Sequence, residues 1–288
     1  MLVGAHVGVA RGYPEAVDYA SSVGCECMQI FCKSPRQWHA RPLDPTVAAS
    51  FKARRIERGM GPVLVHTAYL INLGSADDAL WQRSIDALAD ELKRSAALGA
   101  TAVVTHVGTA WCDDVGASAS RIASAVDRAW QRAQPAPVRL LLENTAAAGT
   151  TFGDGPDELG AILERLSVAD GVGVCLDTCH AHAAGWELSQ PGSWAALVDA
   201  FESSCGIPIE AVHANDCGLP AGQHRDRHAW IGDGTIGYEG FTQIMNDARL
   251  AGIPAITEMP GEVPLKDAEN LRRLKRLRDA SGEPGPSS

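Results

Sequence analysis

Short apolar segments alternate with longer amphipathic segments along the whole chain. The short segments are rich in Val, Ile, Leu and Ala and contain few polar positions, which is typical of parallel strands buried on both faces. They predict strands at Leu2–Val7, Cys27–Phe31, Val63–Val65, Ala102–Thr105, Arg139–Leu142, Gly171–Leu176, Glu210–Val212 and Pro254–Thr257.

The longer segments carry apolar residues at helical spacing. Ser75, Ser118 and Ser193 are candidate N-caps for three of these helices. The first of the three is expected to stop at Gly99 and the second before Pro135. The remaining helices are predicted at Pro14–Val23, Pro45–Arg58, Pro156–Leu166, Gly240–Leu250 and Pro264–Asp279.

Eight strand–helix units follow one another within 288 residues. This order predicts an α/β protein, a (β/α)8 TIM barrel whose functional site lies at the C-terminal ends of the strands. A doubly wound open sheet is the alternative fold. No linker rich in Pro, Gly or Ser divides the chain, so we expect one domain over residues 1–280 and a flexible tail over 281–288.

The composition limits the possible partners. The chain has 25 Lys and Arg against 35 Asp and Glu, a net charge of −10, so a polyanionic substrate would need a local positive field such as bound metal ions. The eight cysteines are spread along a long chain, which favours reduced thiols and a cytoplasmic protein. The first residues do not form a signal-peptide pattern, and no run of about 20 apolar residues predicts a membrane span.

Six imidazoles and carboxylates occupy equivalent positions, each at the end of a predicted strand. They are His66, His106, Glu143, Asp177, His213 and Glu258. In a barrel these strand ends meet on one face. One such histidine alone would more often belong to the core, but three carboxylates buried together require cations to offset their charge. Nitrogen and carboxylate ligands together favour Zn²⁺ or Mn²⁺ over Mg²⁺ or Ca²⁺.

Three further candidate ligands lie in predicted loops. His180 stands three residues after Asp177, and Asp226 and His228 form an Asp-x-His pair after the seventh strand. Each alone would be an ordinary surface residue, but together they could hold one more metal. Nine ligands suit three metal ions, and clustered divalent ions are suited to the hydrolysis of phosphate esters.

The motifs that contain these residues resemble those of the endonuclease IV family, the zinc-dependent apurinic/apyrimidinic endonucleases (AP endonuclease family 2). The resemblance runs from GAH at 4–6 to the eighth strand. It rests on RQW (36–38), HTAYLINLG (66–74), ENTA (143–146), DTCHAHAAG (177–185), HANDC (213–217), DRH (226–228) and GDGTIG (232–237). The chain departs from the family pattern after His106, where VGT replaces the usual Pro-Gly-Ser, and at His182 and Met259.

The resemblance implies three zinc ions, with Mn²⁺ possible at some positions. The implied ligand sets are His66, His106 and Glu143 for the first ion, Glu143, Asp177, His213 and Glu258 for the second, and His180, Asp226 and His228 for the third. It also implies a DNA-repair activity that hydrolyses the phosphodiester 5′ to abasic sites in duplex DNA and leaves a 3′-hydroxyl and a 5′-deoxyribose phosphate. Glu143 would bridge two metals and assist nucleophile activation.

The resemblance implies further that Arg36, Tyr69 and Leu70 enter the DNA at the lesion, where an arginine and an apolar wedge can replace lost stacking. Packing within the loop is the alternative role for Tyr69 and Leu70. The basic residues of Lys33–Arg41 are expected to contact phosphates, and His182 is expected to lie outside the metal sites.

No organic cofactor or membrane partner is expected, and we expect a monomer. Two other functions fit part of the pattern. A metal-dependent sugar isomerase or epimerase would use the six strand-end residues but not the third ligand set. A catalytically idle DNA- or metal-binding protein would not need a complete set of nine ligands.

Overall fold

The computed structural model describes residues 1–133, 138–259 and 263–280, so Pro135 and the predicted tail at 281–288 lie outside the described residues. The barrel strands are β1 (Leu2–His6), β2 (Cys27–Phe31), β3 (Val63–His66), β4 (Ala102–His106), β5 (Arg139–Glu143), β6 (Val172–Asp177), β7 (Ile209–His213) and β10 (Pro254–Thr257). The helices are α1 (Tyr13–Val23), α2 (Pro45–Glu57), α3 (Asp78–Leu98), α4 (Val115–Ala133), α5 (Pro156–Leu163), α6 (Thr178–Ala184), α7 (Ser193–Cys205), α8 (Gly237–Met245) and α9 (Pro264–Asp279).

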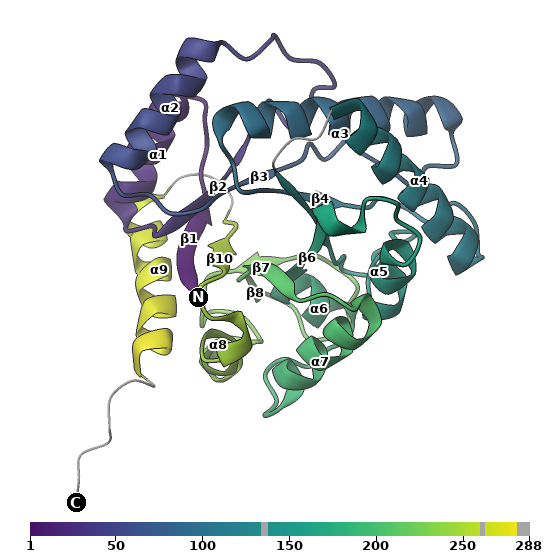
Figure 1. The fold of residues 1–288 in the computed structure, drawn as a ribbon. Coiled ribbons are helices and arrows are strands. Elements are labelled where there is room, and N and C mark those ends of the chain that lie inside the picture. The colour runs from purple at the N-terminus through teal and green to yellow at the C-terminus, as the bar shows by residue number, and fades with distance from the viewer. Residues whose placement is uncertain (134–137, 260–262, 281–288) are drawn as a thin grey trace, which may run out of the picture.

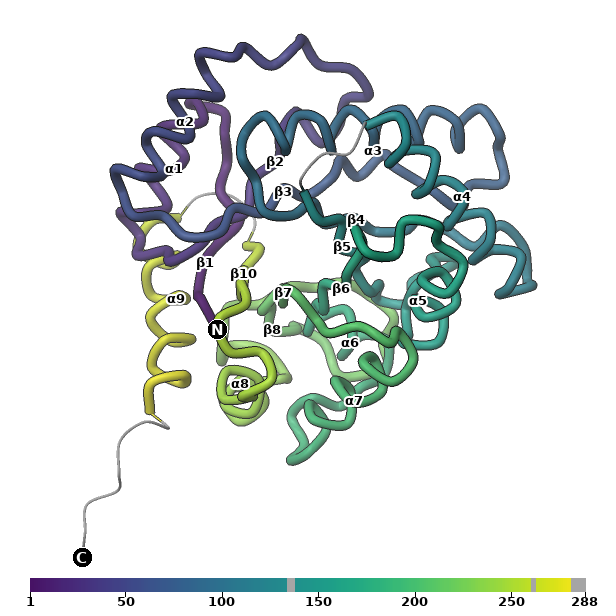
Figure 2. Tube along the Cα trace, in the orientation of Figure 1, coloured from purple at the N-terminus to yellow at the C-terminus, as the bar shows by residue number. Residues whose placement is uncertain are grey.

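The strands form a closed parallel barrel in the order β1-β10-β7-β6-β5-β4-β3-β2. Helices surround this barrel, as the ribbon in Figure 1 and the tube in Figure 2 show from the same direction. The predicted (β/α)8 fold is therefore confirmed, and the open-sheet alternative is wrong. No described helix is both long and apolar enough to cross a membrane.

Alternate positions of each strand face opposite sides of the sheet and create two separate cores. Eight residues that point into the barrel make up the smaller core: Cys27, Leu64, Ala102, Val104, Leu141, Cys175, Ala211 and Ile256. The larger core lies between strands and helices and contains Val65, Val103 and Leu142 among many others. The barrel is therefore filled by side chains rather than open, and it presents a rigid rim.

The predicted helices are present, but the three serines proposed as caps have other roles. Asp77 caps α3, where its carboxylate accepts from the N–H groups of Ala79 and Leu80. Asp114 accepts from the N–H of Ala117 at the start of α4. A carboxylate satisfies the free N–H groups of a first turn as well as a hydroxyl does and also complements the helix dipole.

The hydroxyl of Ser118 instead lies inside α4 and accepts from the N–H groups of Trp111 and Cys112. Ser193 is the first residue of α7, after Gly192, and makes no capping bond. The helix predicted at Gly240–Leu250 begins earlier and divides in two. It ends at Met245 and is followed by a 3-10 turn at Ala248–Leu250, where Asp247 caps a new start.

Gly4 is required where β1 meets β2. It pairs with Cys27, and a Cβ added at Gly4 would stand 2.0 Å from the carbonyl oxygen of Cys27. We expect Gly4→Ala to destabilise the protein by about 1–3 kcal/mol, because the obstructing atoms belong to backbone that cannot rotate away. Urea unfolding would measure this loss. Gly155→Ala is the matched control, since a Cβ there meets nothing within 4 Å, and an equal loss in both variants would contradict the explanation.

Candidate metal centre

The C-terminal end of the barrel carries one inward-facing polar residue from every strand. Seven of the eight stand two positions after a residue of the smaller core, as His66 follows Leu64 and Asp177 follows Cys175, while His6 stands two positions after Gly4 and Glu258 directly follows the end of β10. The period of two in a strand therefore directs both residues of such a pair into the barrel. The eight residues of this ring are His6, Gln29, His66, His106, Glu143, Asp177, His213 and Glu258.

Sequence reasoning identified six members of this ring and missed His6 and Gln29. Gln29 is fully buried, and its amide nitrogen donates to Glu258 at 2.7 Å. Its amide oxygen lies 2.9 Å from Nε2 of His213, and its nitrogen lies 3.0 Å from Nδ1 of His6. Gln29 therefore orients two candidate ligands. Its spacing from Cys27 within an otherwise apolar strand was the available signal.

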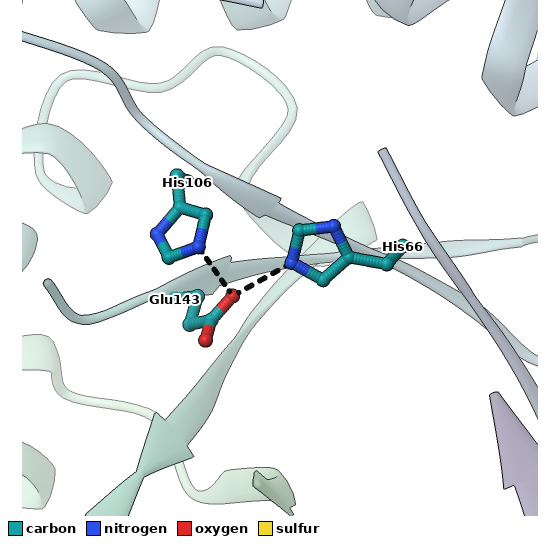
Figure 3. Close-up of side chains that lie close together, drawn as sticks. All are labelled: His66, His106 and Glu143. Carbon is teal, nitrogen blue, oxygen red and sulfur yellow. Dashed lines mark hydrogen bonds and ion pairs between the residues drawn. The ribbon is translucent and has the colours of Figure 1, made fainter. Parts of the chain in front are cut away.

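His66, His106 and Glu143 form the first cluster (Figure 3). Nε2 of His66 lies 3.0 Å and Nε2 of His106 lies 3.4 Å from the same carboxylate oxygen, Oε2 of Glu143. Glu143 and His106 are paired neighbours on β5 and β4, so the sheet itself sets their approach. The structure thus brings together the residues predicted for one metal.

The second cluster uses the other oxygen of Glu143. Nδ1 of His213 lies 2.8 Å from Oε1 of Glu143 and 3.2 Å from Oε2 of Glu258. Asp177 completes this group, with Oδ2 at 3.8 Å from the same nitrogen. Glu143 is therefore shared between the two clusters, one oxygen facing each.

The sequence predicted loops for all three residues of the third group, but only Asp226 lies in a loop. His180 belongs to α6, which begins directly after β6 and is capped by Asp177. His228 begins β9 (His228–Ala229), which pairs antiparallel with β8 (Asp216–Cys217). Asp226 lies between them, 3.5 Å from Nε2 of His180 and 3.1 Å from Nε2 of His228. The three predicted residues are therefore neighbours.

Backbone carbonyls fix the orientation of three candidate histidine ligands. In His66, Nδ1 lies 2.8 Å from the carbonyl oxygen of Thr67. In His180 it lies 3.0 Å from that of Asn144, and in His228 it lies 2.9 Å from that of Glu258. A carbonyl only accepts, so Nδ1 carries the hydrogen in the neutral ring and Nε2 keeps its lone pair. Such bonds are the usual support of histidine ligands to metals.

Nε2 of His228 provides the most direct indication of a cation. It is buried and has no hydrogen-bond partner among the described residues, although a carboxylate oxygen of Asp226 lies 3.1 Å away. When Nδ1 donates to a carbonyl, both facing atoms are acceptors. A buried lone pair that faces a carboxylate oxygen at this separation is stabilised by a proton or a metal cation between them, and nitrogen with carboxylate oxygen suits a divalent ion such as Zn²⁺.

The electrostatics of the cluster lead to the same conclusion. Burial alone would raise the pKa of Glu143, but the charges of His106 and His213 and two histidine hydrogen bonds hold it well below the usual value. Burial raises the pKa of Asp177. It would lower the pKa of His213, but the surrounding acidic groups hold it well above the usual value. The site therefore favours positive charge, which protons or metal ions can supply.

Asn215 supports the second cluster through its amide. Its nitrogen donates to Asp177 at 2.8 Å and to Glu258 at 3.2 Å, and its oxygen accepts from the N–H of Glu258. Asp216, the next residue, is fully buried and accepts from the N–H groups of Gly232, Gly234 and Ile236. The HANDC motif thus anchors the GDGTIG segment, a connection that the sequence did not reveal.

The cavity above these clusters has a volume of about 570 Å³ and is lined by His106, His180, Tyr69, Arg227 and others. Tyr69 is 65 % exposed at its rim, with its ring 5.3 Å from that of Phe31. Arg36 is exposed and Leu70 is half-buried. The residues predicted to meet DNA are thus on loops, and Tyr69 lines the cavity and is not packed inside its loop, whereas Arg36 and Leu70 are not among the lining residues.

Two other predictions had different outcomes. Lys33 was expected to contact phosphates with its neighbours, but this is wrong because its side chain is 1 % exposed and paired with Glu91. His182 is fully buried, and both of its ring nitrogens contact residues other than the candidate metal ligands. Its Nδ1 accepts from the N–H of Leu188, and Nε2 lies 3.1 Å from the hydroxyl of Thr235.

Comparison with known proteins extends over nearly the whole chain. A family model described as a xylose isomerase-like TIM barrel matches residues 17–278. The probable endonuclease 4 of Methanosphaerula palustris is 38 % identical over 278 residues, covering 96 % of this chain and 97 % of that protein. The probable endonuclease 4 of Halorhodospira halophila is 40 % identical over 261 residues, covering 90 % and 88 % of the two chains.

Solved structures give the same relationship. Endonuclease IV from Thermus thermophilus superposes with a TM-score of 0.87 at 34 % identity, over 97 % of this chain and 100 % of that one. A D-tagatose 3-epimerase-like protein has a TM-score of 0.75 at only 19 % identity, over 98 % and 100 % of the two chains, which shows a shared fold alone. The extent and identity of the first set of matches establish that this chain belongs to the endonuclease IV family.

Proposed function

We propose that this protein is a metal-dependent AP endonuclease that hydrolyses the phosphodiester 5′ to an abasic site in duplex DNA. The products would be a 3′-hydroxyl and a 5′-deoxyribose phosphate. The observation that carries the proposal is the gathering of nine nitrogen and carboxylate ligands at one end of the barrel, where six of them line a cavity together with the exposed Tyr69. The names of the relatives support the same activity.

We assign three zinc ions to the site, with Mn²⁺ as an alternative occupant. His66, His106 and Glu143 would hold the first, Glu143, Asp177, His213 and Glu258 the second, and His180, Asp226 and His228 the third. When bound, such ions neutralise phosphate charge, lower the pKa of water and stabilise a leaving oxygen. They would also supply the local positive field that a chain of net charge −10 lacks.

The residues of this chain would position the substrate around that centre. Arg36, Tyr69 and Leu70 stand on two loops, one of which brings Tyr69 to the cavity, and they would fill the gap left by the missing base. An abasic nucleotide is unpaired, so its movement into the cavity costs less than that of a paired nucleotide. Gln29 and Asn215 keep Glu258 oriented from two sides.

A sugar isomerase or epimerase is the second candidate, because epimerase-like proteins share the fold. That reaction would use the strand-end clusters but gives no role to the third group, to Arg36 or to the exposed Tyr69. The third group is complete here, which favours the nuclease.

The activity can be tested with duplex DNA that contains one reduced abasic analogue. The analogue blocks β-elimination, so incision on its 5′ side must be hydrolysis. We expect incision that chelation abolishes and zinc restores, and no incision of undamaged duplex. Manganese is tested in a parallel reaction to separate the two metals. If the folded, metal-replete protein leaves the DNA intact and turns over a sugar phosphate, the isomerase replaces the nuclease as the proposed function.

Glu143→Gln tests the shared carboxylate. The amide keeps the shape but loses the charge and one acceptor oxygen, so both clusters lose a ligand. We expect incision to fall by more than the roughly 10–100-fold typical of supporting residues around a metal, with little change in the fold. Steady-state incision and circular dichroism measure the two effects. The exposed Glu239→Gln is the matched control, and incision by Glu143→Gln at the wild-type rate would disprove the bridging role.

Metal removal should also destabilise the protein. Metals present at about a thousand times Kd stabilise a folded state by roughly 4 kcal/mol, which corresponds to a Tm change on the order of 10 °C for a chain of this size. Differential scanning fluorimetry with and without chelator measures this increment, and elemental analysis measures metal content.

Two histidines of α6 offer a matched pair for the same measurement. His180→Asn should lose one metal equivalent and part of the thermal increment. His182→Asn should retain the full metal content and the full thermal increment, even if its own Tm is lower, because the ring nitrogens of His182 are hydrogen-bonded to Leu188 and Thr235. Equal metal loss in the two variants would contradict the assignment of the third site.

A further inference from the structure

A buried ion pair lies outside the metal centre, between Lys33 and Glu91. The Nζ of Lys33 is 3.3 Å from Oε1 of Glu91, and both side chains are 1 % exposed. Burying two charges is costly unless additional hydrogen bonds satisfy their remaining donors and acceptors. The partners of this pair therefore indicate what it holds in place.

Apart from Asp90 of α3, which lies 3.6 Å from the ammonium of Lys33, those partners belong to two different loops. The ammonium of Lys33 donates to the carbonyl of Trp38 at 3.1 Å. Both carboxylate oxygens of Glu91 accept from the N–H of Ala68 at 3.2 Å. The first contact joins residues on the two sides of Arg36 and so closes the loop that follows β2. The second contact holds Ala68, which directly precedes Tyr69. Glu91 itself stands on α3, which both loops contact.

The same face of α3 holds the rest of the first loop. Arg94 donates to the carbonyls of Ala40 and Arg41 at 3.2 and 2.8 Å, and to Asp90 at 2.7 Å. The guanidinium of Arg83 lies 5.3 Å from the ring centre of Trp38. Figure 2 shows the segment between β2 and α2 extending outward from the barrel and reaching over to α3.

The two loops present the residues assigned to DNA. Arg36 lies between the two anchors of its loop. Burial raises the pKa of the Tyr69 phenol, and the charge of Arg36 is close enough to oppose this rise in part. An arginine and a wedge act together on one lesion only if their separation is set in advance, since a flexible pair would lose entropy on binding.

We propose that Lys33 and Glu91 are positioning residues that lock the Arg36 loop to the Tyr69 loop, so that the abasic site is recognised by a preformed pair. This inference rests on the proposed function. A purely stabilising role is the competing explanation, and it makes a different prediction, because a well-packed neutral pair often stabilises a core as well as the ion pair it replaces.

The decisive variant is the double replacement Lys33→Met/Glu91→Met. It removes both charges, the tie to Trp38 and the acceptor of the Ala68 N–H while nearly preserving volume, whereas Glu91→Met alone would leave the buried ammonium with Asp90, at 3.6 Å, as its remaining acidic partner. We expect an unchanged metal content, a kcat within about twofold of wild type, and a KM for abasic duplex raised roughly tenfold. The amide of Ala68 should exchange with deuterium at least tenfold faster in the absence of DNA.

The matched control removes another ion pair from the same helix. Asp86 of α3 pairs with Arg132 at the surface, where the side chains are 63 % and 40 % exposed, and within the described residues neither has a hydrogen bond or ion pair to the two loops. Asp86→Asn/Arg132→Met should leave both KM and the exchange of Ala68 unchanged. Fluorescence of 2-aminopurine placed opposite the abasic analogue reports the disturbance of the duplex in all three proteins.

The outcomes separate this inference from the proposed function. If wild type incises abasic DNA and the Lys33/Glu91 variant has the wild-type KM and Ala68 exchange, the positioning role is wrong. A variant that loses kcat and metal together would also overturn it, since the pair would then act on the metal centre. If wild type fails to incise but Ala68 exchange still rises only in the Lys33/Glu91 variant, the proposed function fails while the coupling of the loops stands.

Discussion

Charge compensation at Glu143 is the constraint on which the rest of the site depends. This carboxylate is fully buried, and each of its oxygens faces imidazole nitrogens of a different cluster. Asp177, which is also fully buried, and Glu258, whose side chain is 17 % exposed, lie close by, so the barrel mouth gathers three carboxylates with little access to water. Such a concentration of negative charge is stable only with cations in place. The histidines, the supporting amides and the proposed metals all follow from this requirement.

The sequence predicted the barrel well because its strands obey a simple rule. Buried parallel strands are short and apolar, and β2 and β10 begin and end where the pattern placed them. The six strand-end ligands could be predicted for the same reason, since each follows directly after an apolar run. Gln29 was not recognised because its run continues through Ile30 and Phe31, so the polar residue interrupts the strand rather than ending it. His6 was missed as a ring member because the predicted strand ran one residue beyond it.

Features that depend on contacts between distant segments could not be predicted. Asp77 and Ser75 are equally good caps by residue type, and only the path of the chain decides between them. Lys33 looked like a phosphate ligand because its neighbours are basic, but its partner Glu91 is 58 positions away in the chain. The helix that carries His180 is only seven residues long, too short for a periodic pattern to be distinguished from a loop.

Some parts of the site stand on the barrel strands and others on segments added to the barrel, and this explains how one fold can host different reactions. The first two clusters stand on strands, so any barrel with this alternation can build them, and epimerase-like proteins share the architecture. The third group requires α6 and the β8–β9 pair, which Asp216 and His182 hold against the neighbouring segments. Recognition is assigned to two further loops that α3 secures through a buried charge pair. The proposed metal chemistry and the proposed lesion recognition would thus depend on separate supports, so either could change in evolution while the strands and their ligands remain in place.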